Sequence, residues 1–131
     1  MRVMLDTNIL ISALLFPSER MNLLISKIIA EHRLVLSSYV VDELLEVIAR
    51  KFSRKIRTVE LLLHRLPYEF VSTPEEPERG LFEIRDEDDY PVLYSAVTAD
   101  VDVLVTGDRD FENLGLQRPE ILTPAIFLTK Y

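Results

Sequence analysis

The chain has 131 residues, of which 48% are hydrophobic and 28% are charged, and its formal net charge at pH 7 is −7. This length and apolar content predict a single domain over residues 1–131 with its own core, and they exclude a disordered chain. The absence of cysteine excludes disulfides, thiolate nucleophiles and thiolate zinc sites.

Short apolar runs alternate with stretches of helical spacing along the chain. Strands are expected at residues 2–5, 34–36, 68–72, 103–105 and 120–122. Helices are expected at 8–15, after a cap at Ser18, after a cap at Ser37 or Ser38, at 58–66, at 91–99 and after Thr123, with a helical turn at 111–114. This alternation predicts an α/β fold, a three-layer α/β/α domain around a central, mainly parallel sheet of four to five strands.

The helical spacing also predicts which side chains enter the core. In the helix after residue 38 the expected core stripe is Val41, Leu44, Leu45, Ile48 and Phe52. In the helix at 58–66 it is Leu61, Leu62 and Leu66. No stretch approaches the roughly 20 apolar residues of a membrane span, and the first apolar run is too short for a signal peptide. We therefore expect a cytoplasmic protein with no membrane partner.

Four acidic residues stand where a strand ends or a helix begins: Asp6, Glu43, Asp89 and Asp108. Asp6 and Asp108 follow apolar runs typical of buried parallel strands. Because ligands of open α/β sheets bind outside the carboxyl ends of the strands, we expect these acids to share that edge. Carboxylates gathered there repel one another unless a cation neutralises them. The pattern therefore indicates a site for a hard divalent ion, Mg²⁺ or Mn²⁺.

Each acid taken alone also has a structural explanation, which we favour for any single residue. Asp6 could form an Asx turn, and Glu43 could favour the positive end of its helix. The run 86–89 could be a solvated loop, and Asp108 and Asp110 could cap the turn at Phe111. The coincidence of all four on one sheet edge is what favours a metal site.

Two other features bear on a ligand. A window without acids holds five bases, Arg50, Lys51, Arg54, Lys55 and Arg57. It is the best candidate for contacts with the phosphates of a nucleic acid, and a solvated helix surface is an equal alternative. Gly107, between Thr106 and Asp108, predicts a tight turn or a close backbone approach.

The motifs Val-Met-Leu-Asp-Thr-Asn, Ser-x-x-Val-x-x-Glu-Leu, Arg-Asp-x-Asp-Asp and Leu-Val-Thr-Gly-Asp-Arg-Asp-Phe occur in this order over essentially the whole chain. In combination they resemble the PIN-domain ribonucleases, most closely the VapC-like branch, the toxins of toxin–antitoxin pairs. The resemblance implies that Asp6, Glu43, Asp89 and Asp108 are the catalytic acids that hold Mg²⁺ or Mn²⁺. It also implies a small antitoxin as partner and a homodimer as the oligomeric state.

The same resemblance assigns supporting positions. Asn8 and Thr106 match the family's polar residues next to the acids. Many members carry an acid where this chain has Tyr90, so the third ligand is either Asp89 or Asp88. Asp86 and Asp110 are further candidates for the rim of the site.

The sequence thus predicts a metal-dependent endoribonuclease that hydrolyses RNA phosphodiester bonds, because divalent ions activate water and neutralise the scissile phosphate. The alternative is a catalytically inactive PIN-like module that binds RNA or protein. A phosphoacceptor domain also uses strand-end acids and Mg²⁺, but the chain lacks a convincing late strand-end lysine, and Asp-Thr-Asn does not fit its start.

Overall fold

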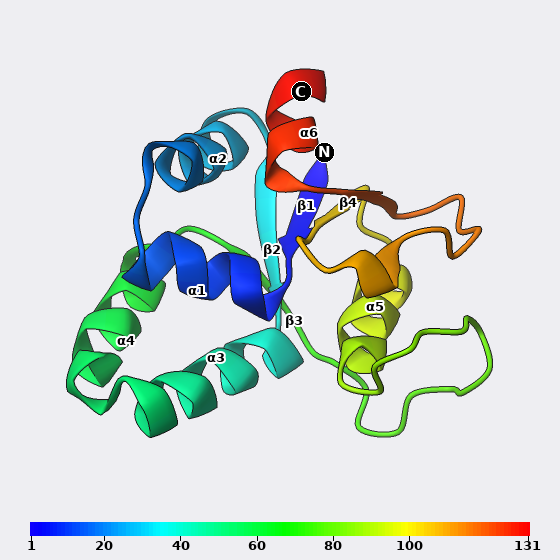
Figure 1. Cartoon of the computed structure of the whole chain (residues 1–131), viewed down its shortest axis with the longest axis horizontal. Helices are drawn as coiled ribbons and strands as arrows, with labels where there is room; N and C mark the ends of the chain where they lie inside the picture. Colours follow the sequence, from blue (N-terminus) through cyan, green and yellow to red (C-terminus); the bar gives the residue numbers. More distant parts are fainter.

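The computed structural model describes residues 1–131 and builds them around one parallel sheet with the strand order β3-β2-β1-β4-β5 (Figure 1). The strands are β1 (Arg2–Leu5), β2 (Arg33–Ser37), β3 (Glu69–Val71), β4 (Val103–Val105) and β5 (Glu120–Leu122). After β1 the chain adds β2 and β3 on one side, and it then returns to place β4 and β5 on the other. The side of the sheet on which the chain adds new strands therefore switches between β1 and β4. Such a switch point is where an open α/β sheet forms its ligand crevice.

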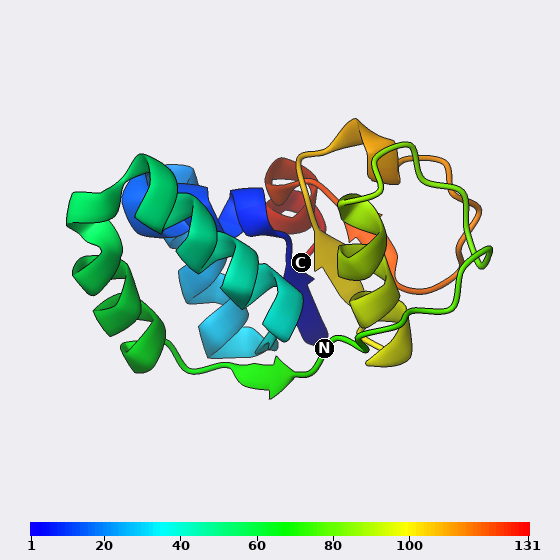
Figure 2. The same cartoon turned by 90° about the horizontal axis from the view of Figure 1, so that it is seen from below.

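Helices cover both faces of this sheet. They are α1 (Thr7–Leu15), α2 (Glu19–Glu31), α3 (Ser38–Lys51), α4 (Ile56–Arg65), α5 (Asp89–Thr98) and α6 (Pro124–Lys130), with 3₁₀ turns η1 (Ser53–Lys55) and η2 (Arg109–Phe111). Figures 1 and 2 show α5 and the loop before it on the face opposite to α1, α2 and α3. The predicted three-layer α/β/α fold is confirmed, with five strands that are all parallel.

No single helix has the length and hydropathy to cross a membrane. Only α1 and α2 taken together have that length and hydropathy, and these two helices are bent by 111° relative to each other.

Local sequence signals set where most helices begin. The side chains of Ser18, Ser37 and Thr123 each accept a hydrogen bond from the backbone N–H three residues later. Such caps satisfy donors that the first helical turn leaves free. These starts were predicted from the sequence and are confirmed. The 3₁₀ turn η2 lies two residues earlier than the helical turn expected at 111–114.

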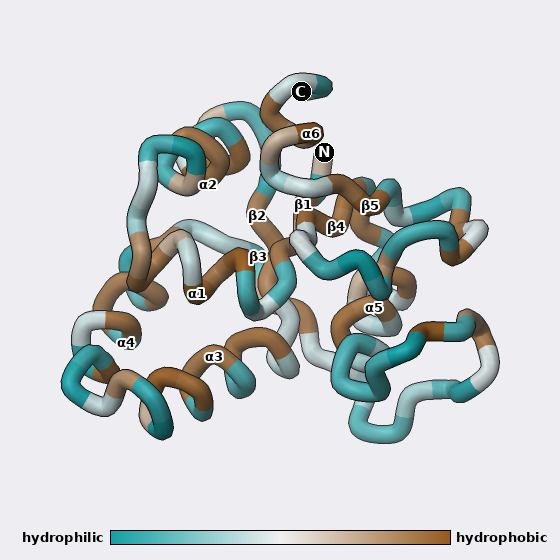
Figure 3. The backbone as a smooth tube through the Cα atoms, in the orientation of Figure 1, coloured by the Kyte–Doolittle hydropathy of each residue, from teal (hydrophilic) through white to brown (hydrophobic).

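The core lies between the central strands and the inner faces of the helices. Residues 3–5, 34–36 and 103–105 are entirely buried, and Figure 3 shows these strands as hydrophobic segments beside a mostly hydrophilic loop before α5. Continuous apolar runs of this kind are typical of parallel strands that are covered on both faces.

Two expected core stripes need correction. In α3, Leu44 and Ile48 are fully buried as predicted, but Val40 completes the stripe and Val41 is only half-buried. In α4, Val59 and Leu63 face the core, whereas Leu61 is 48% exposed. Of the expected set, Leu66 packs against the core, and the assignment of Leu61 was wrong. The helix begins at Ile56 rather than at residue 58, and the stripe that its packing selects follows the four-residue step from Val59 to Leu63.

Candidate metal centre

Asp6 stands at the end of β1 and at the start of α1. Its backbone N–H donates to the Val105 carbonyl of β4 at 3.2 Å, and its Oδ1 accepts from the Ile9 N–H at 2.9 Å. Its other carboxylate oxygen accepts a hydrogen bond from the Thr106 hydroxyl. The residue is only 5% exposed, and burial is the main cause that raises the pKa of Asp6, with smaller contributions from the charges of Asp108 and Glu43. A nearby cation would therefore stabilise the ionised form of this buried carboxylate.

Thr106 also fixes the segment that carries Asp108. The Asp108 N–H donates to the Thr106 hydroxyl oxygen at 3.0 Å, and the Asp108 Oδ1 then caps η2 by accepting from the Asp110 N–H at 2.8 Å. One threonine thus connects the carboxyl end of β4 to both strand-end acids. The capping role that the sequence offered as the structural explanation for Asp108 is present, and it engages only one of the two carboxylate oxygens, Oδ1.

Gly107 lies in a turn, as one of the two expected roles requires, but no close backbone approach needs a glycine there. Its φ angle lies outside the left-handed region, and a Cβ built at this position would meet no atom within 4 Å. The turn between β4 and Asp108 is therefore held by the Thr106 hydroxyl rather than by a conformation that only glycine adopts.

Asp89 opens α5, across from the strand ends. Its Oδ2 atom is buried and has no hydrogen-bond partner. Burial, and after it the charge of Asp108, raises the pKa of Asp89 to about 7. Asp88 is exposed at the cap position of α5 and makes no side-chain capping bond there. Of the two candidates for a third ligand, Asp89 is the one that lies beside Asp108.

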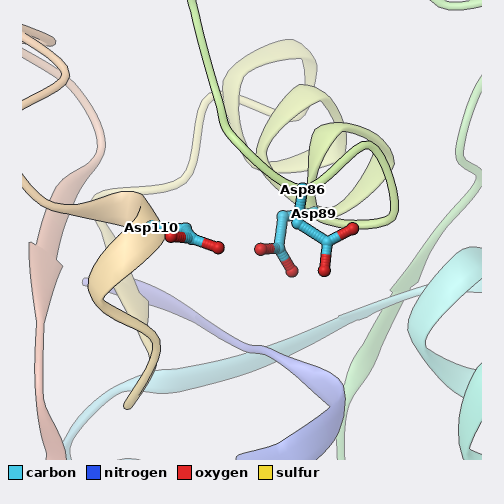
Figure 4. A group of neighbouring side chains, drawn as sticks. All are labelled: Asp86, Asp89 and Asp110. Atoms are coloured by element: carbon cyan, nitrogen blue, oxygen red, sulfur yellow. The ribbon is translucent and has the colours of Figure 1, made fainter.

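Two further acids complete this side of the centre. Figure 4 shows the carboxylates of Asp86, from the loop before α5, and of Asp89, from the start of α5, facing that of Asp110 from η2. One oxygen from each of these residues lies within 4.8 Å of the others. The sequence placed Asp86 and Asp110 at the rim, and the structure brings both of them close to Asp89.

Glu43 reaches the centre from the side of α3. Its Oε2 accepts a hydrogen bond of 3.3 Å from the Tyr39 hydroxyl, one helical turn earlier on the same helix. Burial and the Glu43 charge raise the pKa of Tyr39, so its hydroxyl remains a proton donor at neutral pH. The sequence analysis missed Tyr39, although the four-residue spacing between it and Glu43 was a usable signal.

Five of the acids described above, all except Asp6 and Asp110, line one cleft of about 410 Å³. Its lining consists of Thr7, Asn8, Ile11, Phe16, Glu43, Val47, Lys51, Phe52, Asp86, Asp88, Asp89 and Asp108. Thr106 and Asp6 are buried next to it. From the basic window only Lys51 lines the cleft, whereas the other four residues of the window, Arg50, Arg54, Lys55 and Arg57, are exposed around the junction of α3 and α4.

The residues of the centre fit a divalent cation. No lysine, arginine or histidine forms an ion pair with Asp6, Asp89 or Asp108. Two buried oxygens, Asp89 Oδ2 and Thr7 Oγ1, lack any hydrogen-bond partner. An all-oxygen donor set with uncompensated negative charge is the set that Mg²⁺ and Mn²⁺ prefer.

Comparisons with known proteins agree with this geometry. A family model described as "PIN domain" matches residues 2–110. The fold is similar to a chain in the crystal structure of VapBC2 from Rickettsia felis bound to a DNA fragment from their promoter, with a TM-score of 0.72 and 18% sequence identity. That similarity covers 93% of this chain and 97% of the other. No curated protein matches the sequence.

Proposed function

The chain belongs to the PIN-domain family, and on that premise we propose that it is a metal-dependent endoribonuclease that hydrolyses RNA phosphodiester bonds. The observation that carries the proposal is the convergence of Asp6, Glu43, Asp89 and Asp108 around one cleft. Asp6 and Asp108 lie between a strand and the helix or turn after it, and Asp89 is the first residue of α5. Glu43 does not stand at a helix start as expected, because it lies in the second turn of α3. In this proposal residues 1–131 form a single nuclease domain.

Asp6, Glu43, Asp89 and Asp108 are the proposed ligands of Mg²⁺ or Mn²⁺. When bound, the ion lowers the pKa of a coordinated water and offsets the charge of the scissile phosphate. Thr106 holds the Asp6 carboxylate in one orientation, and Tyr39 does the same for Glu43. Asn8 is exposed in the cleft, where its amide can bind a substrate oxygen. Asp86 and Asp110 add negative charge next to Asp89, and Asp88 adds it in the cleft, which favours a doubly charged ion over a singly charged one.

We further propose that the enzyme is the toxin of a toxin–antitoxin pair and works as a homodimer inhibited by a small antitoxin protein. The order of the motifs and the similarity of the fold to a VapBC2 chain support this assignment. An open reading frame for a small protein next to the gene, and co-purification of its product with this chain, would test the pairing.

Cleavage of a mixed RNA pool tests the activity. The wild-type protein should cleave it with Mn²⁺ and leave it intact with EDTA, and Asp6→Asn should remove the Mn²⁺-dependent cleavage. Asp42→Asn is the matched control, because Asp42 is an aspartate of α3 that forms no ion pair and has no place in this cleft. Equal cleavage by wild type and Asp6→Asn would overturn the proposal. Binding of RNA without any cleavage would favour the inactive binding module instead.

A further inference from the structure

The cleft extends beyond the acids into an aromatic end formed by Phe16 and Phe52. We infer that this end is a subsite for an unpaired nucleobase, so that the substrate is single-stranded RNA at the cleavage site. The inference rests on the proposed function, because that function places the scissile phosphate at the acids.

Two helices form the walls that connect the acids to the aromatic end. On α3, Glu43, Val47 and Lys51 recur at four-residue steps and therefore lie along one face. On the other wall, Thr7 and Ile11 of α1 lead to Phe16, the residue at the carboxyl end of that helix. The cleft thus passes from carboxylates, over the aliphatic side chains of Val47 and Ile11, to the two rings.

Phe16 is a large apolar residue that is 56% exposed. Its ring packs edge-to-face against Phe52, with the ring centroids 5.6 Å apart and an interplanar angle of 73°. This contact leaves much of Phe16 open to solvent while Phe52 supports it from one side. Exposed aromatic rings are the groups on which single-stranded nucleic acids stack their bases.

Lys51 supplies the one positive charge among the residues that line the cleft. It is exposed and forms no ion pair, so its ammonium group is free to contact a phosphate next to the stacked base. The cleft volume of about 410 Å³ falls within the range of roughly 300–1,000 Å³ that is common for small-ligand sites.

The chemistry of this subsite predicts how selective it is. Phenylalanine rings carry no hydrogen-bonding group that distinguishes one base from another, so stacking tolerates any base. Bases inside a duplex are already stacked and paired, which prevents them from entering the cleft. The subsite therefore selects for an unpaired loop or tail rather than for one nucleotide.

Stacking can be measured separately from cleavage. In an Asp6→Asn background, which does not cleave under the proposed function, we would titrate a single-stranded oligouridine that contains one 2-aminopurine. Binding should quench the 2-aminopurine fluorescence. Phe16→Ala and Phe16→Leu should remove the quenching and weaken binding about ten- to a hundredfold, whereas Phe16→Trp should preserve both.

The matched control is Phe70→Ala, because Phe70 is a phenylalanine of β3 that is 54% exposed and does not line the cleft. It should leave the quenching unchanged. In the cleaving protein, Phe16→Ala should raise KM for single-stranded RNA much more than it lowers kcat, because stacking contributes equally to the bound substrate and the transition state.

The outcomes separate the subsite from the activity. The subsite would be overturned if the oligonucleotide failed to bind. It would also be overturned if the oligonucleotide bound with a fluorescence that Phe16→Leu does not change. Either result would favour a protein partner for the exposed rings. If the wild type still cleaved RNA with Mn²⁺, the proposed function would survive that result. Quenching that depends on Phe16 in a protein that cleaves no RNA would retain the subsite and refute the nuclease.

Discussion

The Thr106 hydroxyl donates a hydrogen bond to the buried carboxylate of Asp6. The two residues are a hundred positions apart in the sequence, and each directly follows one of the paired strands β1 and β4. The bond therefore lies at the ends of β1 and β4, the two strands between which the strand order switches sides. It holds the least exposed acid of the centre in place.

Replacement of Thr106 tests this relationship. Thr106→Val keeps the shape of the side chain but leaves an Asp6 oxygen and the Asp108 N–H without their partner. We expect Mn²⁺ affinity to fall about ten- to a hundredfold, and the free energy of unfolding to fall by about 1–3 kcal/mol. Calorimetric titration and urea unfolding would measure the two effects. Thr106→Ser should restore most of both, and failure of serine to do so would refute a role for the hydroxyl.

The stability of the metal-free protein should depend on pH around neutrality. The pKa of Asp89 is about 7 in the fold, above the ordinary value of an aspartate, so the folded state favours the protonated acid. The resulting stability is present at acidic pH and is lost as the pH rises through about 7. In EDTA we therefore expect a lower Tm at pH 8 than at pH 6, and Asp89→Asn should reduce the difference. An equal dependence in Asp89→Asn would assign it to other groups.

Tyr90 of α5 holds the loop before this helix through several contacts. These contacts should also fix the positions of the acids in and next to the loop. Tyr90 stacks on Phe82 with ring centroids 4.5 Å apart, its hydroxyl donates to the Glu78 carbonyl, and the Arg79 guanidinium lies 4.6 Å from its ring centroid. Tyr90→Phe should lower the free energy of unfolding by about 1 kcal/mol, and Tyr90→Ala by about 3–5 kcal/mol.

Hydrogen exchange provides the local test of the same loop. Tyr90→Ala should speed amide exchange in residues 78–88 more than in the central strands, and it should weaken Mn²⁺ binding because Asp86 lies in that segment. Uniform acceleration across the whole chain would show that Tyr90 only stabilises the fold.

The basic window offers a prediction about RNA affinity. Arg54 and Arg57 are exposed near the junction of α3 and α4, outside the acidic cleft. If they bind phosphates, replacing both with glutamine should reduce the log–log slope of RNA affinity against salt concentration by about 0.7 for each phosphate that is no longer neutralised. Filter binding at several salt concentrations would measure this slope. An unchanged slope would favour the alternative, a solvated helix surface.

Local signals predicted much of this fold. Short apolar runs indicated four of the strands, and alternation over residues 68–72 indicated β3. Serine or threonine before an apolar periodicity indicated the starts of α2, α3 and α6. The site was predictable for a related reason. In a parallel sheet the residues after β1 and β4 must emerge at one edge, so strand assignment was enough to place Asp6 and Asp108 at the same edge. The direct pairing of β1 with β4, which makes the two acids neighbours, was not predicted.

What the sequence could not provide depends on contacts between distant segments. The face of α4 that packs inward was assigned wrongly, because leucines at 61, 62, 63 and 66 allow more than one apolar stripe and the neighbouring elements decide between them. The approach of Asp86 to Asp110 depends on the path of a long loop, which Phe82 secures by packing on Tyr90. The periodicity of apolar residues within one segment does not predict a contact between two distant segments.

Anomalous diffraction from crystals grown with Mn²⁺ would show directly whether Asp6, Glu43, Asp89 and Asp108 surround a divalent cation. We expect a manganese peak in the cleft, within coordination distance of Asp89 and Asp108 and next to Asp6, that disappears in Asp6→Asn. A well-ordered cleft without any peak at saturating Mn²⁺, or a peak bound only by residues elsewhere on the surface, would contradict it.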